Sequence, residues 1–306
     1  MEVERNMEQR TNSCVRRAVE LLAIDSPSGY TRQAAEHVMG AYEAMGLRPE
    51  MTRKGGVMVC LNPEAPAEDG LLLEAHLDTL GAMVSEISGS GRLHLTSLGG
   101  MQPNNGEAEN VRIVTRSGKI YTGTFQLKNA STHVNGEYAS TKREYKTMEV
   151  VIDEEVSSRE DVEKLGIMTG DVVCFDPRTV VTPSGYIKSR FLDDKLSAAI
   201  LLELAAQVAS GEIKPKRRVW EHITVFEEVG HGGSASVPEG VTEALSVDMG
   251  CVGDGLSCDE RQVSICAKDS GGPYHYEVVS ALIEAARRGG ADFAVDVYPY
   301  YGSDVE

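Results

Sequence analysis

The hydrophobic positions in the first part of the chain alternate between two periodicities. Val15, Val19 and Leu22 recur at helical spacing, and a second helical stripe begins at the capping residue Thr31 and stops at Gly46. Two apolar runs follow, each short enough for a buried strand. The pattern predicts helices over residues 12–24 and 31–46 and strands over residues 57–61 and 71–75.

The pattern of apolar and polar residues changes between residues 82 and 176. Helical periodicity nearly vanishes there, and Gly, Asn and Ser separate short runs of alternating apolar and polar residues. One short helix is expected over residues 157–166, which have a serine cap and an acidic first turn. We therefore expect an inserted all-β, barrel-like domain over residues 82–176. Its clearest strands are expected at residues 92–97, 111–115, 119–125, 148–153 and 171–175.

Alternation of helices and strands resumes after the insert. A strongly apolar helix is expected over residues 195–210, and another over residues 273–289, opened by Pro273. Such repetition implies an α/β fold with a central sheet flanked by helices. Residues 1–81 and 177–306 would then form one discontinuous α/β domain around the insert. Its later strands are expected at residues 217–226, 244–250, 262–268 and 292–300.

Charge and composition exclude two classes of partner. The net charge of −17 over 306 residues argues against a nucleic-acid backbone, and the sequence has no basic block. Residues 1–10 are charged and lack the apolar centre of a signal peptide. No apolar run approaches the ~20 residues that span a bilayer. We therefore expect neither a nucleic-acid partner nor a membrane partner.

The six cysteines are scattered among apolar neighbours without a CxxC pair. In a chain of this length they are expected as reduced, packed thiols, which indicates a cytoplasmic protein. The spacings between Cys251, Cys258 and Cys266 match no usual zinc knuckle.

Histidine and carboxylate residues follow several of the predicted strands and precede one predicted helix. Strands of α/β sheets carry their chemistry at their carboxyl ends, so these side chains would crowd one rim and the carboxylates would repel one another. Divalent cations would relieve that repulsion, and mixed histidine and carboxylate ligands suit zinc, with cobalt or manganese as substitutes. Two bridged metals would make a hydrolytic centre. The residues are His76, Asp78, Asp193, Asp194, Glu227, Glu228 and Asp248.

Each of these residues also has a structural interpretation. His76 alone is more often a satisfied, partly buried histidine than a ligand, and Asp193 or Asp194 is more often a helix cap. Asp248 before Met249-Gly250 suits a turn, and the two glutamates suit a solvated strand exit. Taken together, these residues favour a metal centre. If each had only its structural role, all of them would have to lie at strand ends by chance.

Four motifs, in order along the chain, resemble one known family. They are "EAHLDTLGAMV", "SRFLDDKLSAA", "VFEEVGHGGSA" and "SVDMG", with a β insert between the first two. The chain resembles the dinuclear-zinc aminopeptidases of the glutamyl-aminopeptidase and tetrahedral-aminopeptidase family, some of which carry an endoglucanase label. The resemblance covers nearly the whole chain. It implies a zinc-exopeptidase fold with a central mixed sheet and a barrel-like insert.

The resemblance implies roles for the metal ligands. His76 and Asp248 are similar to ligands of the first metal, and Asp193 to the carboxylate that bridges both metals. Glu228 is similar to a ligand of the second metal. The family pattern also implies a cis peptide bond between Asp193 and Asp194.

The resemblance implies catalytic roles for Glu227 and Asp78. Glu227 is similar to the general base that activates the metal-bridging water, and Asp78 to the carboxylate that holds the ring of His76. If the backbone is extended at Glu227 and Glu228, their side chains leave on opposite sides, so one reaches a metal and the other the water.

One departure from the family pattern concerns the second metal. The family has a further histidine ligand downstream of a segment like Gly302-Ser303-Asp304, together with a final strand and helix, and this sequence ends shortly after that segment. The second metal would then have only Asp193 and Glu228, which predicts a weak or empty site. His231 and His275 are the two candidates to replace that histidine as a ligand of the second metal.

The function expected from these features is a metal-dependent aminopeptidase that takes peptides with a free N-terminus. The resemblance also implies a homo-oligomer, from dimer to dodecamer, with the insert as the dimerisation or assembly domain. A specialised small-peptide peptidase or amidase and a catalytically impaired assembly subunit are the alternatives. A glycosidase is disfavoured, because one Trp and 6% aromatic residues leave few platforms for sugars.

Overall fold

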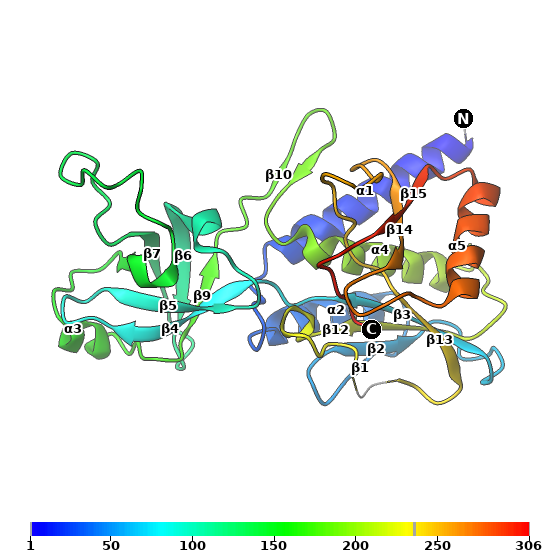
Figure 1. The fold of residues 1–306 in the computed structure, drawn as a ribbon. Helices are drawn as coiled ribbons and strands as arrows, with labels where there is room; N and C mark the ends of the chain where they lie inside the picture. The colour runs from blue at the N-terminus through cyan, green and yellow to red at the C-terminus, as the bar shows by residue number, and fades with distance from the viewer. Residues whose placement is uncertain (1, 235–236, 306) are drawn as a thin grey trace.

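The computed structural model describes residues 2–234 and 237–305. Figure 1 shows two parts, a β-barrel at one end and a sheet with helices at the other, and both chain termini lie in the second part. None of the described helices has the length and apolar character needed to cross a membrane.

The main sheet has five strands in the order β1-β2-β12-β3-β13. β3 pairs in parallel with both of its neighbours, while β2 pairs antiparallel with β1 and β12, so the sheet is mixed. The expected fold class is therefore confirmed. The strands are β1 (Glu50–Met51), β2 (Val57–Cys60), β3 (Gly70–His76), β12 (Val219–Thr224) and β13 (Val241–Ser246).

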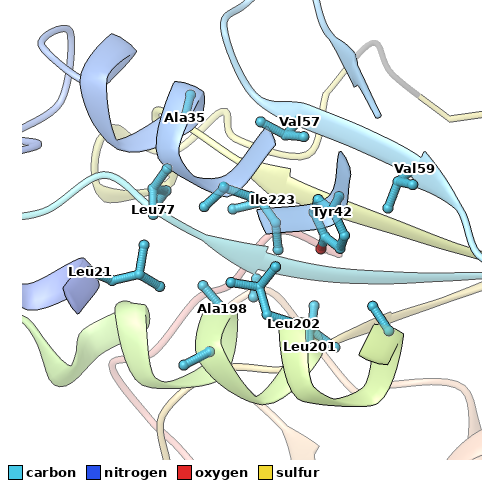
Figure 2. Close-up of a cluster of buried hydrophobic side chains, with 14 of the residues drawn as sticks. Leu21, Ala35, Tyr42, Val57, Val59, Leu77, Ala198, Leu201, Leu202 and Ile223 are labelled. Atoms are coloured by element: carbon cyan, nitrogen blue, oxygen red, sulfur yellow. The ribbon is translucent and has the colours of Figure 1, made fainter. Parts of the chain in front are cut away.

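Three helices enclose the core on one face of this sheet: α1 (Glu2–Leu22), α2 (Arg32–Ala44) and α4 (Leu192–Ala209). Alternate residues of a strand face opposite sides, and the odd-numbered positions of β3 and β12 point into this core. Figure 2 shows Ile223 and Leu77 among side chains from these helices, including Tyr42, Ala198 and Leu202. The even-numbered positions, which include His76, lie on the other face. α1 begins about ten residues earlier than the pattern predicted.

The insert forms a closed barrel in the order β4-β5-β8-β7-β6-β9. Its core is apolar, and Phe125 and Phe175 pack edge to face with ring centroids 5.5 Å apart. Ser158 caps the short helix as expected by accepting a hydrogen bond from the backbone N–H of Asp161. The elements are β4 (Gly81–Ile87), β5 (Leu93–Leu98), η1 (Pro103–Gly106), β6 (Glu109–Val114), β7 (Ile120–Leu127), η2 (Tyr145–Thr147), β8 (Met148–Ile152), α3 (Arg159–Lys164) and β9 (Val172–Phe175).

The barrel is tied to the rest of the chain close to the metal-ligand segments. The chain enters the barrel at β4, shortly after β3. It leaves the barrel at β9, and residues 176–191 then lead to α4. Arg112 on β6 forms a bidentate ion pair with Asp25 after α1, with both N···O distances 2.6 Å. Such paired charge-assisted bonds fix orientation as well as distance. Lys195 of α4 is buried beside this junction and donates to the backbone oxygens of Leu21 and Ile24.

The last part of the chain differs from the sequence prediction. β14 (Val263–Lys268) and β15 (Phe293–Val297) pair only with each other among the described residues and do not join the main sheet. α5 (Tyr276–Gly289) begins three residues after Pro273, because Pro273 forms an isolated bridge with Lys268 instead. A hairpin that was not predicted, β10 (Val180–Val181) and β11 (Ile187–Lys188), projects between the two parts in Figure 1.

Candidate metal centre

His76 is the last residue of β3, and only 2% of its surface is exposed. Its Nδ1 lies 2.9 Å from the backbone oxygen of Asp78, and its Nε2 lies 2.9 Å from Oδ1 of Asp193. If Nδ1 carries the proton and donates it to the carbonyl, Nε2 keeps a free lone pair. The ring then presents the nitrogen that a metal would bind towards the carboxylate of Asp193.

The carboxylate of Asp78 makes other contacts than the expected one to the ring. Its Oδ1 lies 3.7 Å from Nδ1 of His76, which is beyond hydrogen-bond distance. It accepts a hydrogen bond from the backbone N–H of Glu227 at 3.1 Å, and Oδ2 accepts one from the hydroxyl of Ser28 at 2.5 Å. Asp78 therefore connects the chain after β3 to the chain after β12, and its backbone carbonyl orients the ring.

Asp193 and Asp194 lie in the first turn of α4 and are joined by a cis peptide bond. Both residues have non-helical backbone dihedral angles, so the regular part of α4 begins after them. Asp194 is fully buried, and its Oδ2 accepts a hydrogen bond from the backbone N–H of His76 at 3.1 Å. Its Oδ1 has no hydrogen-bond partner among the described residues.

Glu227 and Glu228 do not continue strand β12. Phe226 has a positive φ of 72°, and the two glutamates begin a single turn of 3-10 helix, η3 (Glu227–Val229). The prediction of an extended backbone here is therefore wrong, because the left-handed residue turns the chain out of the sheet before the glutamates are reached. Oε2 of Glu227 nevertheless lies 3.6 Å from Nε2 of His76.

Asp248 lies two residues after the end of β13. Its Oδ1 accepts a hydrogen bond of 2.6 Å from the backbone N–H of Met249, a local contact typical of an aspartate in a turn. Its Oδ2 accepts one of 2.6 Å from the hydroxyl of Ser303, which is 55 residues away along the chain. The carboxylate of Asp248 is therefore held both by a neighbouring backbone group and by a side chain that is distant in the sequence.

The structure brings the predicted ligands together in two overlapping groups. His76, Asp193 and Glu228 form the first, and His76, Asp194 and Asp248 form the second. In each group the donor atoms lie within 4.8 Å of one another. Asp194 was not among the predicted ligands, whereas the other four were.

The two substitute histidines lie elsewhere. His231 stacks on Phe226 with ring centroids 5.2 Å apart, and His275 is exposed and lies 3.3 Å from Glu277. Neither residue, and no cysteine, joins the two ligand groups among the residues that the structure describes.

Some contacts of the site were not predicted from the sequence. Ser28 binds Asp78 from the loop after α1, and Ser303 binds Asp248 from the end of the chain. Asp304 contacts the hydroxyl of Thr224 at the end of β12. The only sequence signal for Ser303 and Asp304 was the likeness of their segment to a family motif, and that likeness gave them no role.

Burial and mutual repulsion raise the pKa values of the carboxylates. Burial is the main cause that raises the pKa of Glu227 and of Glu228 to about 8, and the charge of Asp193 adds to it in both cases. Burial also raises the pKa values of Asp194 and Asp248, and each is raised further by another carboxylate of the site. The cluster holds more negative charge than its surroundings stabilise.

The pKa of His76 is also raised, although burial acts on it in the opposite direction. Burial lowers its pKa, but the hydrogen bond with Asp193 and the charges of Asp194 and Asp248 outweigh burial and hold the pKa well above its usual value. Without a metal, this histidine is the cluster's own source of positive charge.

The residues present fit divalent metal ions. The donor set of one imidazole and several carboxylates is typical of such sites, and a buried carboxylate oxygen of Asp194 has no hydrogen-bond partner among the described residues. In a mixed α/β sheet with this cluster at its strand ends, bound metal ions would be placed as in metal-dependent hydrolases.

The chain belongs to the M42 glutamyl aminopeptidase family, whose model matches residues 55–306. It is 42% identical over 285 residues to the putative aminopeptidase YhfE of Bacillus subtilis. The matched region covers 93% of this chain and 82% of that relative. Family membership makes the chain a metal-dependent aminopeptidase, a hydrolase.

Two solved structures share the fold. An aminopeptidase from the archaeon Desulfurococcus kamchatkensis is 22% identical, with a TM-score of 0.80 over 96% of this chain and 82% of that one. The TET1 peptidase of Pyrococcus horikoshii is 21% identical, with a TM-score of 0.80 over 95% of this chain and 86% of that one. That peptidase can assemble into a tetrahedron or a large octahedral shell.

Proposed function

We propose that the protein removes N-terminal residues from peptides with two divalent metal ions at the candidate centre. His76, Asp193 and Asp248 would hold the first ion, and Asp193 and Glu228 the second. Zinc suits these ligands best, with cobalt or manganese as substitutes. The observation that carries the proposal is the convergence of one buried histidine with acidic groups from separate strand and helix ends, in two overlapping groups of three that each have donor atoms within 4.8 Å.

Glu227 is the proposed general base. When bound, the metal ions would polarise the scissile carbonyl and lower the pKa of a water molecule. Oε2 of Glu227 lies 3.6 Å from Nε2 of His76, so its carboxylate lies beside the proposed metal ligands. This suits a group that takes a proton from the attacking water and then gives it to the leaving amine.

Asp78 is the proposed positioning residue for this chemistry. Its carbonyl orients the ring of His76, and its carboxylate accepts the backbone N–H of Glu227. One residue therefore sets the relative position of a metal ligand and of the general base.

The acidic cluster also favours one class of substrate. A peptide with a free N-terminus carries a positive α-amino group, which we expect at the metal and carboxylate cluster. An acylated N-terminus has no such charge. The site therefore suits an exopeptidase.

We further propose that the protein is a homo-oligomer, between a dimer and a dodecamer, with residues 82–176 as the assembly domain and residues 1–81 and 177–306 as the catalytic domain. The shared fold of the Pyrococcus horikoshii peptidase, which assembles into closed shells, supports an oligomer. A cytoplasmic location is supported by the six free cysteines.

The proposal is tested with aminoacyl p-nitroanilides. We expect hydrolysis that is abolished by thorough chelation with EDTA and restored by Zn²⁺ or Co²⁺, because the carboxylate cluster needs metal charge to act on the substrate. The measurement is the release of p-nitroaniline before chelation, after it and after metal return.

N-acetylated versions of the same substrates are the control, and they should be poor substrates. Activity that persists after complete removal of metal would contradict the proposal. Faster hydrolysis of the acetylated compounds would favour an amidase or specialised peptidase on the same scaffold, and sugar release from cellulose without peptide hydrolysis would favour a glycosidase.

A further inference from the structure

The segment Tyr301–Asp304 lies across the ends of two strands that lead to the metal centre. The hydroxyl of Tyr301 donates to the backbone oxygen of Met249 at 2.9 Å. Ser303 contacts Asp248, and Asp304 contacts Thr224. The side chains of Tyr301, Ser303 and Asp304 therefore all contact the end of β12 or the residues that follow β13.

The contact between Ser303 and Asp248 is directional. An ionised carboxylate only accepts hydrogen bonds, so the hydroxyl of Ser303 is the donor in the 2.6 Å bond to Oδ2 of Asp248. Ser303 also contacts the hydroxyl of Ser246, which must then be the donor in that second bond. Ser246 thus fixes the rotation of the Ser303 hydroxyl and aims its proton at Asp248.

This bond helps to orient the carboxylate of Asp248. The other oxygen accepts a hydrogen bond from the backbone N–H of the next residue, a contact that moves with the turn, and the hydroxyl of Tyr301 also interacts with this carboxylate. Each carboxylate oxygen has two lone pairs, so a bond from Ser303 leaves acceptor sites free on both oxygens. The orientation seen here brings a carboxylate oxygen of Asp248 within 4.8 Å of donor atoms of His76 and Asp194.

We propose that Ser303 is a positioning residue of the metal centre, whose hydroxyl holds the carboxylate of Asp248 in the orientation that binds the first metal ion. The inference rests on the proposed metal-binding role of Asp248. Partners that orient metal ligands change metal affinity by about 10- to 100-fold when removed.

A general structural role of the segment makes a different prediction. The segment has an independent anchor, because the backbone oxygen of Tyr301 accepts hydrogen bonds from the backbone N–H and the hydroxyl of Ser270 at 3.0 and 2.6 Å. Ser270→Ala removes one of these anchoring bonds but no contact to Asp248. If Ser303 only fastened the chain, the two alanine variants would behave alike.

The test is calorimetric titration of the metal-free full chain with Zn²⁺. Ser303→Ala is expected to weaken the tighter Zn²⁺ site about 10- to 100-fold, whereas Ser303→Thr, which keeps a hydroxyl, and Ser270→Ala should stay close to the unmodified protein. Ser246→Ala, which frees the rotation of the Ser303 hydroxyl, should give a smaller loss. Thermal unfolding of each metal-free variant shows whether it is folded.

The outcomes separate this inference from the proposed function. Unchanged Zn²⁺ affinity in Ser303→Ala would overturn the inference and leave the metal centre intact. Equal losses in Ser303→Ala and Ser270→Ala would also overturn it, in favour of a structural anchor. Failure of the unmodified protein to bind Zn²⁺ would overturn both. A selective loss in Ser303→Ala would support the inference even if no peptide were hydrolysed.

Discussion

Replacement of Glu227 by glutamine is expected to lower kcat for peptide hydrolysis by about 100- to 10,000-fold, the range that general acid–base catalysis contributes. Glutamine keeps the size and a hydrogen-bonding oxygen of the side chain but cannot take up the proton. The contact from the backbone N–H to Asp78 does not involve the side chain, so the local geometry should persist. The measurement is kcat at saturating substrate, with metal content determined on the same samples.

Glu228→Gln is the matched control. Glu228 is the next residue in the same 3-10 turn, and burial raises its pKa to about 8 as well. As the proposed ligand of the second metal, it should lower the metal-to-protein ratio when changed, whereas Glu227→Gln should keep the ratio of the unmodified protein. The assignment of the general base would be wrong if Glu227→Gln kept its kcat or lost metal as Glu228→Gln does.

The folded protein should lose stability as the pH rises from about 5 to about 8, and Glu221 should be one of several buried carboxylates that cause the change. Glu221 is fully buried on the helix-covered face of the sheet, where the hydroxyl of Tyr42 donates to its Oε2 at 2.8 Å. Its Oε1 has no hydrogen-bond partner among the described residues. Burial raises its pKa to about 8.

The sign follows from proton binding. An unfolded glutamate ionises near pH ~4.3, while the folded one keeps its proton to about pH 8, so between these values the folded state binds more protons. The free energy of unfolding should therefore fall by about 1.4 kcal/mol for each pH unit from this residue.

Glu221→Gln removes this ionisation. Urea unfolding across this pH interval, in EDTA, should show a slope against pH that is shallower by about 1.4 kcal/mol per unit in the variant. Glu43→Gln, an exposed change on α2, should leave the slope unaltered. Parallel curves for Glu221→Gln and the unmodified protein would show that Glu221 ionises normally in the fold.

Much of the fold could be predicted because its signals are local. Alternating apolar residues gave five of the six barrel strands, and the strand missed, β4, directly follows the His76–Asp78 motif. Helical stripes gave α2 and α4 within a few residues of their bounds. The early start of α1 was missed because residues 2–11 are largely charged and carry no apolar stripe.

The remaining features depend on contacts between distant residues. The separation of β14 and β15 from the main sheet is decided by pairing across the fold, which periodicity does not report. The 3-10 turn at Glu227 depends on a left-handed Phe226, and a bulky aromatic residue gives no sign of that conformation. The contacts of Ser28 and Ser303 span 50 and 55 residues.

The composition of the candidate site was easier to predict than its contacts. The placement of polar residues after apolar runs indicated seven residues, and the family resemblance implied that His76, Asp193, Glu228 and Asp248 are the ligands; these four do come together. Asp194 was indicated as part of this cluster, but the resemblance gave it no ligand role, and sequence adjacency cannot show which carboxylate oxygen is left without a partner.

The central claim is that His76 and its carboxylate neighbours hold metal. Anomalous diffraction at the zinc absorption edge, from crystals grown with Zn²⁺, tests it most directly. The account predicts a peak about 2.0–2.2 Å from Nε2 of His76 and from carboxylate oxygens of Asp193 and Asp248. Well-ordered crystals with zinc peaks elsewhere, or with none beside His76, would contradict it.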